Sequence, residues 1–452
     1  IQGLKISDSQ VAVKGLFGAV RVGNMSIDNL KLESVDISGT SQNYDGFLFG
    51  SVEMKRNSEL EISNCKFSGE VAGNSHCGAV AGNVEAINRN ATMKITNCDL
   101  TISSTSYGTW WDGKKRNSSF KGGMIGRYNS EANTKLILNG IKCNVDLAGY
   151  NEEGYDSACV GGMIGVLIGT AKVYVYQCAV TGKIISSGYA GWAGGIVGNM
   201  NGCDTYKQSD CYVTTSISSS WNAYGYPYNA GGFLEGPYVQ KSKGYIKNSY
   251  FAGDSGSAVG FIAKDYSSNE NGFKIYNSYY DSDKVRNHEF HTDGHCYVIS
   301  GTTVNCKAYT TEQMAEQNNY EDWDFDNVWI MKDGYPELRM NDFTLPEDFR
   351  ENESWNIAES EIVKIVKDYA SQEYYDQWSM IYNSDLPDTA KYEKILALAS
   401  NYGVTDPKEG LEYVIKSNNK RWAYKELTTD DLFVASQFLD WLNKDGHRLL
   451  LD

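Results

Sequence analysis

Ala193-Gly194-Gly195-Ile196-Val197-Gly198 is a short glycine-rich element that recurs along the chain. Gly161-Gly162-Met163-Ile164-Gly165 and Gly122-Gly123-Met124-Ile125-Gly126 are close copies of it. Most successive copies lie about 32 to 44 residues apart, a period that indicates a solenoid, a propeller or another repeat array. Looser copies begin at Gly15, Gly46, Gly78, Gly231 and Ser257.

A second motif, apolar-x-Asn-(Cys/Ser)-x-apolar, has the same period as the first. Asparagine suits a bend, where its side chain can hydrogen-bond nearby backbone and stack on the asparagine of the next coil. Two unrelated motifs that share one period are stronger evidence for a repeat than either alone. The copies are Asn64-Cys65, Asn97-Cys98, Asn248-Ser249 and Asn277-Ser278, with degenerate members at Asn29-Leu30, Lys142-Cys143, Gln177-Cys178 and Asp210-Cys211.

Five of the ten cysteines fall at one repeat position in this alignment: Cys65, Cys98, Cys143, Cys178 and Cys211. We expect them to form a ladder of small buried groups, which needs no disulfide. Outside the ladder, Cys203 with Cys211, or Cys296 with Cys306, could close a short loop in an oxidising compartment. The sequence leaves both pairings open.

Residues 1–285 are predicted to form a mostly β domain, a parallel β-helix (solenoid) of about eight coils. The strands of each repeat are too short to bury a face alone, so stacking coil on coil must bury the core and pair the strand edges. The glycines suit positions of positive φ or of close backbone packing. A propeller is the alternative, but its blades need about four antiparallel strands with hairpin turns, which the repeats do not show.

The predicted solenoid is followed by two further segments. Residues 286–344 are expected to hold an inserted loop and a C-terminal cap, because an open end would expose core and strand edges. Residues 345–452 lose glycine and gain helical periodicity, which predicts a small all-α domain that continues beyond Asp452. The cap residues expected to cover the last coil are Trp323, Phe325, Trp329, Tyr335 and Leu338.

The composition limits the class of partner. The 452 residues include 45 glycines, 32 tyrosines and 6 prolines, which favours strands and turns. A net charge of −16 argues against nucleic acid and anionic membrane surfaces. No apolar run is long enough to span a bilayer, so we expect no membrane insertion by this segment. The chain opens inside a repeat without a starting Met, and we expect it to be a piece of a longer protein.

The Gly194-Gly195-Ile196-Val197-Gly198 element, with Asn-Ser-Tyr or Asn-Cys after it, resembles the GLUG-motif repeats of large bacterial surface proteins. Thr310–Met314, Trp323–Ile330 and Gly334–Leu338 resemble the segment that often terminates such repeats. The resemblance covers about residues 10 to 340 and implies an adhesin-like protein outside the cell or on a bacterial surface. Gly15-Leu16-Phe17-Gly18, followed by Asn29-Leu30-Lys31-Leu32, is also similar to the segment that precedes the catalytic domain of IgA-cleaving zinc metallopeptidases.

Aromatic residues crowd the loops between each Asn-Cys strand and the next glycine-rich element. Equivalent loops of a solenoid stack along one side, so these rings are expected to line a common face that binds a glycan or a protein. The alternative is that the rings pack the loops against one another. The candidate ligand-binding residues are Tyr107, Trp110, Trp111, Tyr150, Tyr155, Tyr189, Trp192, Trp221, Tyr224, Tyr226 and Tyr228.

Two other kinds of site were considered. His288, His291 and His295, near Cys296 and Cys306, have the ligand types of zinc but not the HExxH spacing, and a polar surface loop is the favoured interpretation. A carboxylate active site needs two acids that converge in a groove. The available acids are Asp112, Asp254, Asp281 and Asp283, and no pattern selects a pair among them.

We therefore predict a non-catalytic recognition, adhesion or spacer module of a large bacterial surface or secreted protein, without a cofactor. Its expected partner is a host glycan or glycoprotein, or another domain of the same protein. The alternative is the substrate-engaging segment of a secreted peptidase of the IgA-cleaving type, which an HExxH segment after Asp452 would support. A third hypothesis is a stalk that binds nothing.

Overall fold

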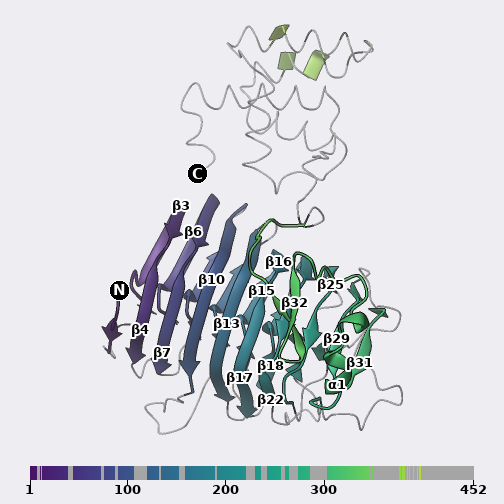
Figure 1. Ribbon diagram of the computed structural model, residues 1–452. Coiled ribbons are helices and arrows are strands. Elements are labelled where there is room, and N and C mark those ends of the chain that lie inside the picture. The colour runs from purple at the N-terminus through teal and green to yellow at the C-terminus, as the bar shows by residue number, and fades with distance from the viewer. Residues whose placement is uncertain are drawn as a thin grey trace. The chain divides into compact units, whose positions relative to one another are not determined.

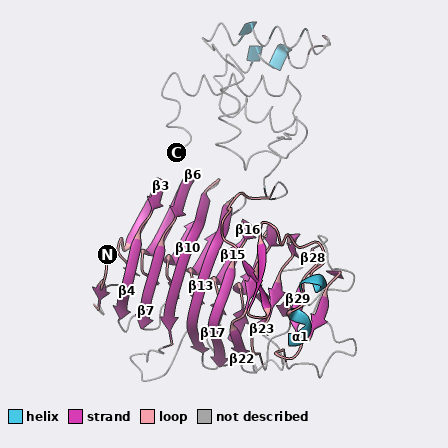
Figure 2. Cartoon of the chain, viewed as in Figure 1, coloured by secondary structure: helices cyan, strands magenta, loops and turns pink. Residues whose placement is uncertain are grey.

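The computed structural model describes residues 1–349 except 8–10, 12, 39–43, 73–75, 87–89, 106–119, 132–133, 152–157, 189–190, 220–229, 236–241, 256–259, 264–272, 286–302 and 347–348, with single positions between 376 and 398. Within this part the chain is mostly β and forms a parallel β-helix, as predicted (Figures 1 and 2). The described residues do not settle the number of coils, so about eight stays a prediction.

Each coil begins with a short strand. These strands together form a separate sheet, called the short-strand sheet here. Its strands pair in parallel in the order of the chain, which gives one strand per coil. They are β2 (Val13–Lys14), β5 (Tyr44–Gly46), β8 (His76–Gly78), β11 (Phe120–Gly122), β14 (Ala158–Gly161), β18 (Gly191–Gly194) and β23 (Ala230–Gly231).

A sharp turn leads from the short strand into the first of three further segments, which all belong to one large parallel sheet. In some coils one long strand covers two of these segments. The strands of the first segment are β3 (Ala19–Asp28), β6 (Phe49–Ser63), β9 (Ala81–Ala86), β12 (Ile125–Ser130), β15 (Ile164–Gly169), β19 (Val197–Asn201), β24 (Leu234–Glu235) and β27 (Ile262–Ala263), of which β3 and β6 run on into the second.

The second and third segments are separated by the bend of the Asn motif. The second segment holds β10 (Thr92–Ser104), β13 (Lys135–Asn151), β16 (Lys172–Tyr176), β20 (Thr205–Ser209), β25 (Lys243–Lys247), β28 (Lys274–Tyr276) and β30 (Thr303–Val304), of which β10 and β13 run on into the third. The third holds β1 (Lys5–Ile6), β4 (Lys31–Ser38), β7 (Lys66–Ala72), β17 (Ala179–Gly188), β21 (Tyr212–Val213), β22 (Ser216–Ser219), β26 (Tyr250–Phe251), β29 (Tyr279–Asp281) and β31 (Lys307–Tyr309).

The last two strands of the solenoid, β30 and β31, show that the predicted end of the repeats was wrong. Strand β30 pairs with β28, and β31 pairs with β29, so the solenoid continues to Tyr309 rather than ending at residue 285. Asn305-Cys306 is a copy of the bend motif there. The sequence period concealed it because residues 286–302 intervene.

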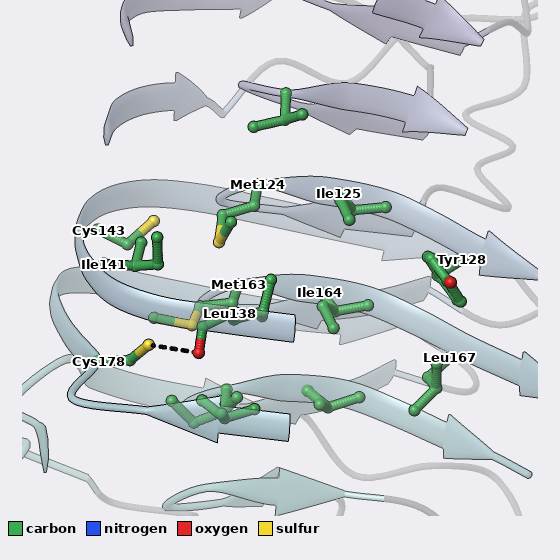
Figure 3. Packing of buried hydrophobic residues seen from close by; sticks show 14 of the residues in the cluster. Met124, Ile125, Tyr128, Leu138, Ile141, Cys143, Met163, Ile164, Leu167 and Cys178 are labelled. Atoms are coloured by element: carbon green, nitrogen blue, oxygen red, sulfur yellow. Dashed lines mark hydrogen bonds between the residues drawn. The ribbon is translucent and has the colours of Figure 1, made fainter. Parts of the chain in front are cut away.

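The glycine-rich element is a turn between two strands, and the turns of successive coils nearly touch. A Cβ built on Gly162 would lie 2.0 Å from the carbonyl oxygen of Gly195, one coil further on. A contact that short leaves no room for any side chain, so glycine is required here by close backbone packing. The apolar residues inside the element face the core: Met124 and Met163 stack, as do Ile125 and Ile164 (Figure 3).

The Asn position is a bend with a left-handed backbone, as expected. Asn29, Asn64, Asn97, Gln177, Asp210, Asn248, Asn277 and Asn305 all have φ between 42° and 55°. The backbone N–H groups of six of them (Asn29, Asn64, Gln177, Asp210, Asn248 and Asn277) donate to a carbonyl of the next coil, for example from Asn64 to Thr96 at 3.1 Å. Their side chains stack as predicted: Asn97 Nδ2 donates to Asn64 Oδ1 at 2.7 Å, and Asn305 Nδ2 to Asn277 Oδ1 at 3.0 Å.

The residue after the bend is small because it must also donate a hydrogen bond. The Cys98 thiol donates to the carbonyl of Thr96 at 3.3 Å, and the hydroxyls of Ser249 and Ser278 make the same bond at 2.8 and 2.7 Å. Each of these carbonyls also accepts the bend N–H of the preceding coil, so the thiol or hydroxyl supplies its second hydrogen bond. This explains the Cys/Ser alternation of the motif.

The cysteine ladder differs from the predicted one at two places. Ile141, not Cys143, pairs with Cys98, while Cys143 pairs with Leu100. Cys306, assigned outside the ladder, belongs to it. All cysteines in the described part of the chain are free thiols, so Cys203 and Cys211 do not pair, and the proposed partner Cys296 lies outside that part.

The predicted cap residues pack against the solenoid, but across a flank. The cap (residues 310–340) contains α1 (Thr311–Met314), a 3₁₀ turn (Gln317–Asn319) and the hairpin β32 (Trp329–Lys332) and β33 (Tyr335–Leu338). Its aromatic rings lie against Tyr212, Tyr250 and Tyr279, which sit on three successive coils, so the cap is not confined to the last one. Trp329 is fully buried, and its Nε1 donates to Asp210 Oδ1 at 3.1 Å.

After the cap, the strap (residues 341–346 with Phe349) runs back over the second segment. Phe349 packs on Tyr174, Tyr176 and Tyr245. Residues 345–349 therefore belong to the solenoid unit, which ends at Phe349, and not to the predicted helical domain. Most of residues 350–452 lie outside the described residues, and their helices stay a prediction.

A substitution at one bend separates backbone strain from the side-chain ladder. Alanine normally makes a folded protein more stable than glycine does. At φ 51°, the value at Asn97, its Cβ lies too close to the following carbonyl oxygen, which strains the backbone. We expect Asn97→Gly to lose only the ladder bonds and Asn97→Ala to be less stable still, by about 1 kcal/mol. Urea unfolding of both variants measures the difference. An alanine variant as stable as the glycine variant would contradict a strained bend.

Candidate ligand-binding face

The structure describes two of the eleven predicted ligand-binding residues. Trp192 lies on β18 and Tyr150 near the end of β13, where it pairs with Ser187. The other nine lie outside the described residues, as do His288, His291 and His295: Tyr107, Trp110, Trp111, Tyr155, Tyr189, Trp221, Tyr224, Tyr226 and Tyr228. Within the described part, no group of three or more His, Cys, Asp or Glu could hold a metal ion.

Trp192 belongs to a row of side chains on the outward face of the short-strand sheet. Residues alternate between the two faces of a strand, and the neighbouring row, with Cys77, Val160 and Ala193, is in the core. The row itself, called the outer row here, is Val13, Tyr44, His76, Phe120, Cys159 and Trp192.

The middle of the outer row is a stack of rings from three successive coils. The centroids of His76 and Phe120 are 4.4 Å apart with the planes 7° from parallel, and those of Tyr44 and His76 are 5.4 Å apart. All three side chains are partly buried. The sequence analysis missed these residues, although each lies two positions before the first glycine of a repeat element.

The imidazole of His76 is locked in one tautomer. Its Nδ1 accepts a hydrogen bond from the Phe120 backbone N–H at 3.1 Å, so Nε2 carries the proton. Burial, with a smaller effect from the Arg127 charge, lowers the pKa of His76 to about 4. The ring is therefore neutral at physiological pH and acts as an aromatic platform with one N–H donor.

A polar network on the first segment borders this stack. Arg127 Nη1 donates to Asn83 Oδ1 at 2.9 Å and also contacts Glu85 Oε1. Asn129 Nδ2 donates to Glu85 Oε2 at 2.7 Å, and Asn83 Nδ2 donates to Ser51 Oγ at 3.1 Å. The Arg127 and Glu85 side chains are 20% and 24% exposed, so the network is firmly held yet reachable from solvent.

The candidate catalytic carboxylates instead hold the cap in place. Asp281 is fully buried and accepts hydrogen bonds from the Thr311 hydroxyl at 2.7 Å and the Tyr335 hydroxyl at 2.5 Å. Asp283 accepts the Thr311 backbone N–H at 2.9 Å. Asp254 is exposed, and Asp112 lies outside the described residues. Asp281 and Asp283 therefore have a structural role at the cap, whereas no such role is assigned to Asp254.

The arrangement of rings and polar groups suits binding. Stacked rings offer an apolar surface, and the adjacent amide, guanidinium and carboxylate groups can exchange hydrogen bonds with hydroxyls. No family model, no curated protein and no solved structure matches the chain. Among the described residues, no helix combines the length and the apolar character that a membrane crossing requires.

The low pKa of His76 predicts a pH-dependent loss of stability. The folded protein binds a proton at His76 less readily than the unfolded chain does. The free energy of unfolding therefore has no loss from this group above pH 6.5, and it falls as the pH drops from 6.5 toward 4. Nitrogen-15 NMR of the His76 ring should show a midpoint near 4, and His76→Gln identifies its signal. A His76 midpoint near 6.5 would contradict the buried, neutral ring.

Proposed function

We propose that this chain is a recognition module of a large bacterial surface or secreted protein, which binds a glycan through the outer row and its polar border. The observation that carries the proposal is the partly buried stack of Tyr44, His76 and Phe120 beside the Arg127–Glu85 network. A sugar presents an apolar ring face together with a rim of hydroxyls, and this face offers a partner for each.

The repeat explains how such a face could bind a polymer. Parallel stacking places equivalent side chains about 4.8 Å apart on successive coils, which gives a long, regular surface. The predicted aromatic loops lead directly into the short strands, since Trp192 follows residues 189–190. Rings from these loops would extend the outer row if they reach it. The extracellular location is part of the proposal and rests on the GLUG-like repeats.

The second candidate function is that of a segment which engages the substrate of a secreted peptidase. The similarity of residues 15–18 and 29–32 to the peptidase segment favours it. It requires binding of a host protein, with immunoglobulin as the first to test, whereas the first proposal requires binding of a glycan.

A glycan array, with mucin and immunoglobulin as added targets, tests the proposal. The chain should bind a glycan, and Phe120→Ala with Trp192→Ala should weaken that binding at least about tenfold, because each ring contributes about 1 kcal/mol or more of contact. Phe17→Ala is the matched control, since Phe17 is an exposed ring outside the outer row. Equal loss in the control, or binding by neither variant nor the unaltered chain, would refute a site on the outer row.

A further inference from the structure

Two pairs of cysteines occupy the position after the bend on adjacent coils. The strands that flank each bend are in register, and this places Cys65 directly beside Cys98, and Cys178 directly beside Cys211. Ile141, the neighbour of Cys98 on the following coil, separates the two pairs. Each of these four thiols therefore has a single thiol neighbour in the ladder.

The spacing of the coils suits a disulfide between such neighbours. Equivalent Cα atoms of adjacent parallel strands lie about 4.8 Å apart, and disulfides join Cα atoms that are about 4.4 to 6.8 Å apart. Backbone hydrogen bonds hold both sides of the first pair at this spacing. On one side the Asn64 N–H donates to the carbonyl of Thr96 at 3.1 Å, and on the other the Asp99 N–H donates to that of Cys65 at 3.0 Å. Closing this bridge therefore requires no rearrangement of the coils.

A bridge between Cys65 and Cys98 would remove one hydrogen bond from each thiol but would leave no carbonyl unsatisfied. Cys65 Sγ donates to the carbonyl of Ser63 at 3.0 Å, and Cys98 Sγ donates to that of Thr96 at 3.3 Å. Both carbonyls also accept the bend N–H of the preceding coil. They therefore stay hydrogen-bonded when the thiols no longer donate.

The bends beside the two pairs differ in their exposure to solvent. Asn64 and Asn97, which precede the cysteines of the first pair, are exposed. Gln177 and Asp210, which precede those of the second pair, are buried, and the cap residue Trp329 donates its indole N–H to Asp210. All four cysteines are buried, so a small oxidant reaches the first pair more easily, through its open bends.

Cys65 is also the thiol of the first pair that ionises more readily. Its hydrogen bond with the Cys98 thiol lowers the pKa of Cys65 to about 7, and burial acts against this shift. The same interaction, together with burial, raises the pKa of Cys98. In the second pair, burial raises the pKa of Cys211. Because the thiolate is the reactive form of cysteine, Cys65 is expected to react first.

We propose that Cys65 and Cys98 form a peroxide-sensitive thiol pair that closes as a disulfide between two adjacent coils. The Cys65 thiolate attacks one peroxide oxygen, the O–O bond breaks, and the released hydroxide takes up a proton to become water. The Cys98 sulfur then attacks the sulfur of the Cys65 sulfenic acid. The S–O bond breaks, and the hydroxide leaves with the proton of Cys98 as a second water. Two thiols are thereby oxidised and one peroxide is reduced, independently of any glycan binding.

The test treats the folded full chain with hydrogen peroxide, alkylates the remaining thiols in urea and maps the peptides by mass spectrometry. Two peptides joined through Cys65 and Cys98, lighter by two hydrogens than the separate thiol peptides, should appear. Cys178 and Cys211 are an internal control with the same spacing. They should form a bridge at least about tenfold more slowly, because their thiols are sealed from solvent and protonated.

Cys98→Ser removes the second thiol but keeps a hydroxyl that can donate to the same carbonyl, as Ser249 and Ser278 do on later coils. In this variant no bridge should form, and Cys65 should accumulate as a sulfenic acid, which dimedone traps. The inference is overturned if Cys65 and Cys98 stay free at a peroxide concentration that oxidises the urea-unfolded chain. A bridge between Cys178 and Cys211 that forms as fast as the first would also overturn it.

Discussion

The bend after the second segment is the constraint on which the solenoid depends. Each coil must turn at the same residue, or the parallel register of the next coil is lost and its core face turns outward. The left-handed residue sets the direction of the turn, and its N–H donates to the following coil. The Cys or Ser after it gives the carbonyl before it a second hydrogen bond. One short motif therefore fixes geometry, register and hydrogen bonding together.

Much of this could be derived from the sequence because it is local and repeated. The parallel β-helix, the asparagine ladder and a ladder of cysteines that needs no disulfide follow from two motifs in one period. The missed register at Cys143 has a long-range cause. In that coil Gly140 replaces asparagine, because Phe343 occupies the space of a side chain there. The adjacent Asn139 bonds to Phe343 across 204 residues, and no periodicity reveals such a contact.

The candidate site was only partly foreseeable. Aromatic loops were visible in the sequence, but His76 and Phe120 are single residues in short strands, and their stacking is evident only once the coils are in register. A solenoid assembles surfaces from residues that are neighbours only across coils, as the stack of rings on the short-strand sheet shows.

Hydrogen exchange at the bends tests the central claim most directly. The amides of Asn64, Gln177 and Asp210 lie at polar turns, yet each donates to a carbonyl of the next coil, at 3.1, 3.2 and 3.1 Å. If coil stacking through the bend holds the solenoid together, these amides exchange as slowly as the amides of the flanking strands. Exchange at the rate of an exposed turn would show that the bends open independently and that the ladder does not carry the fold.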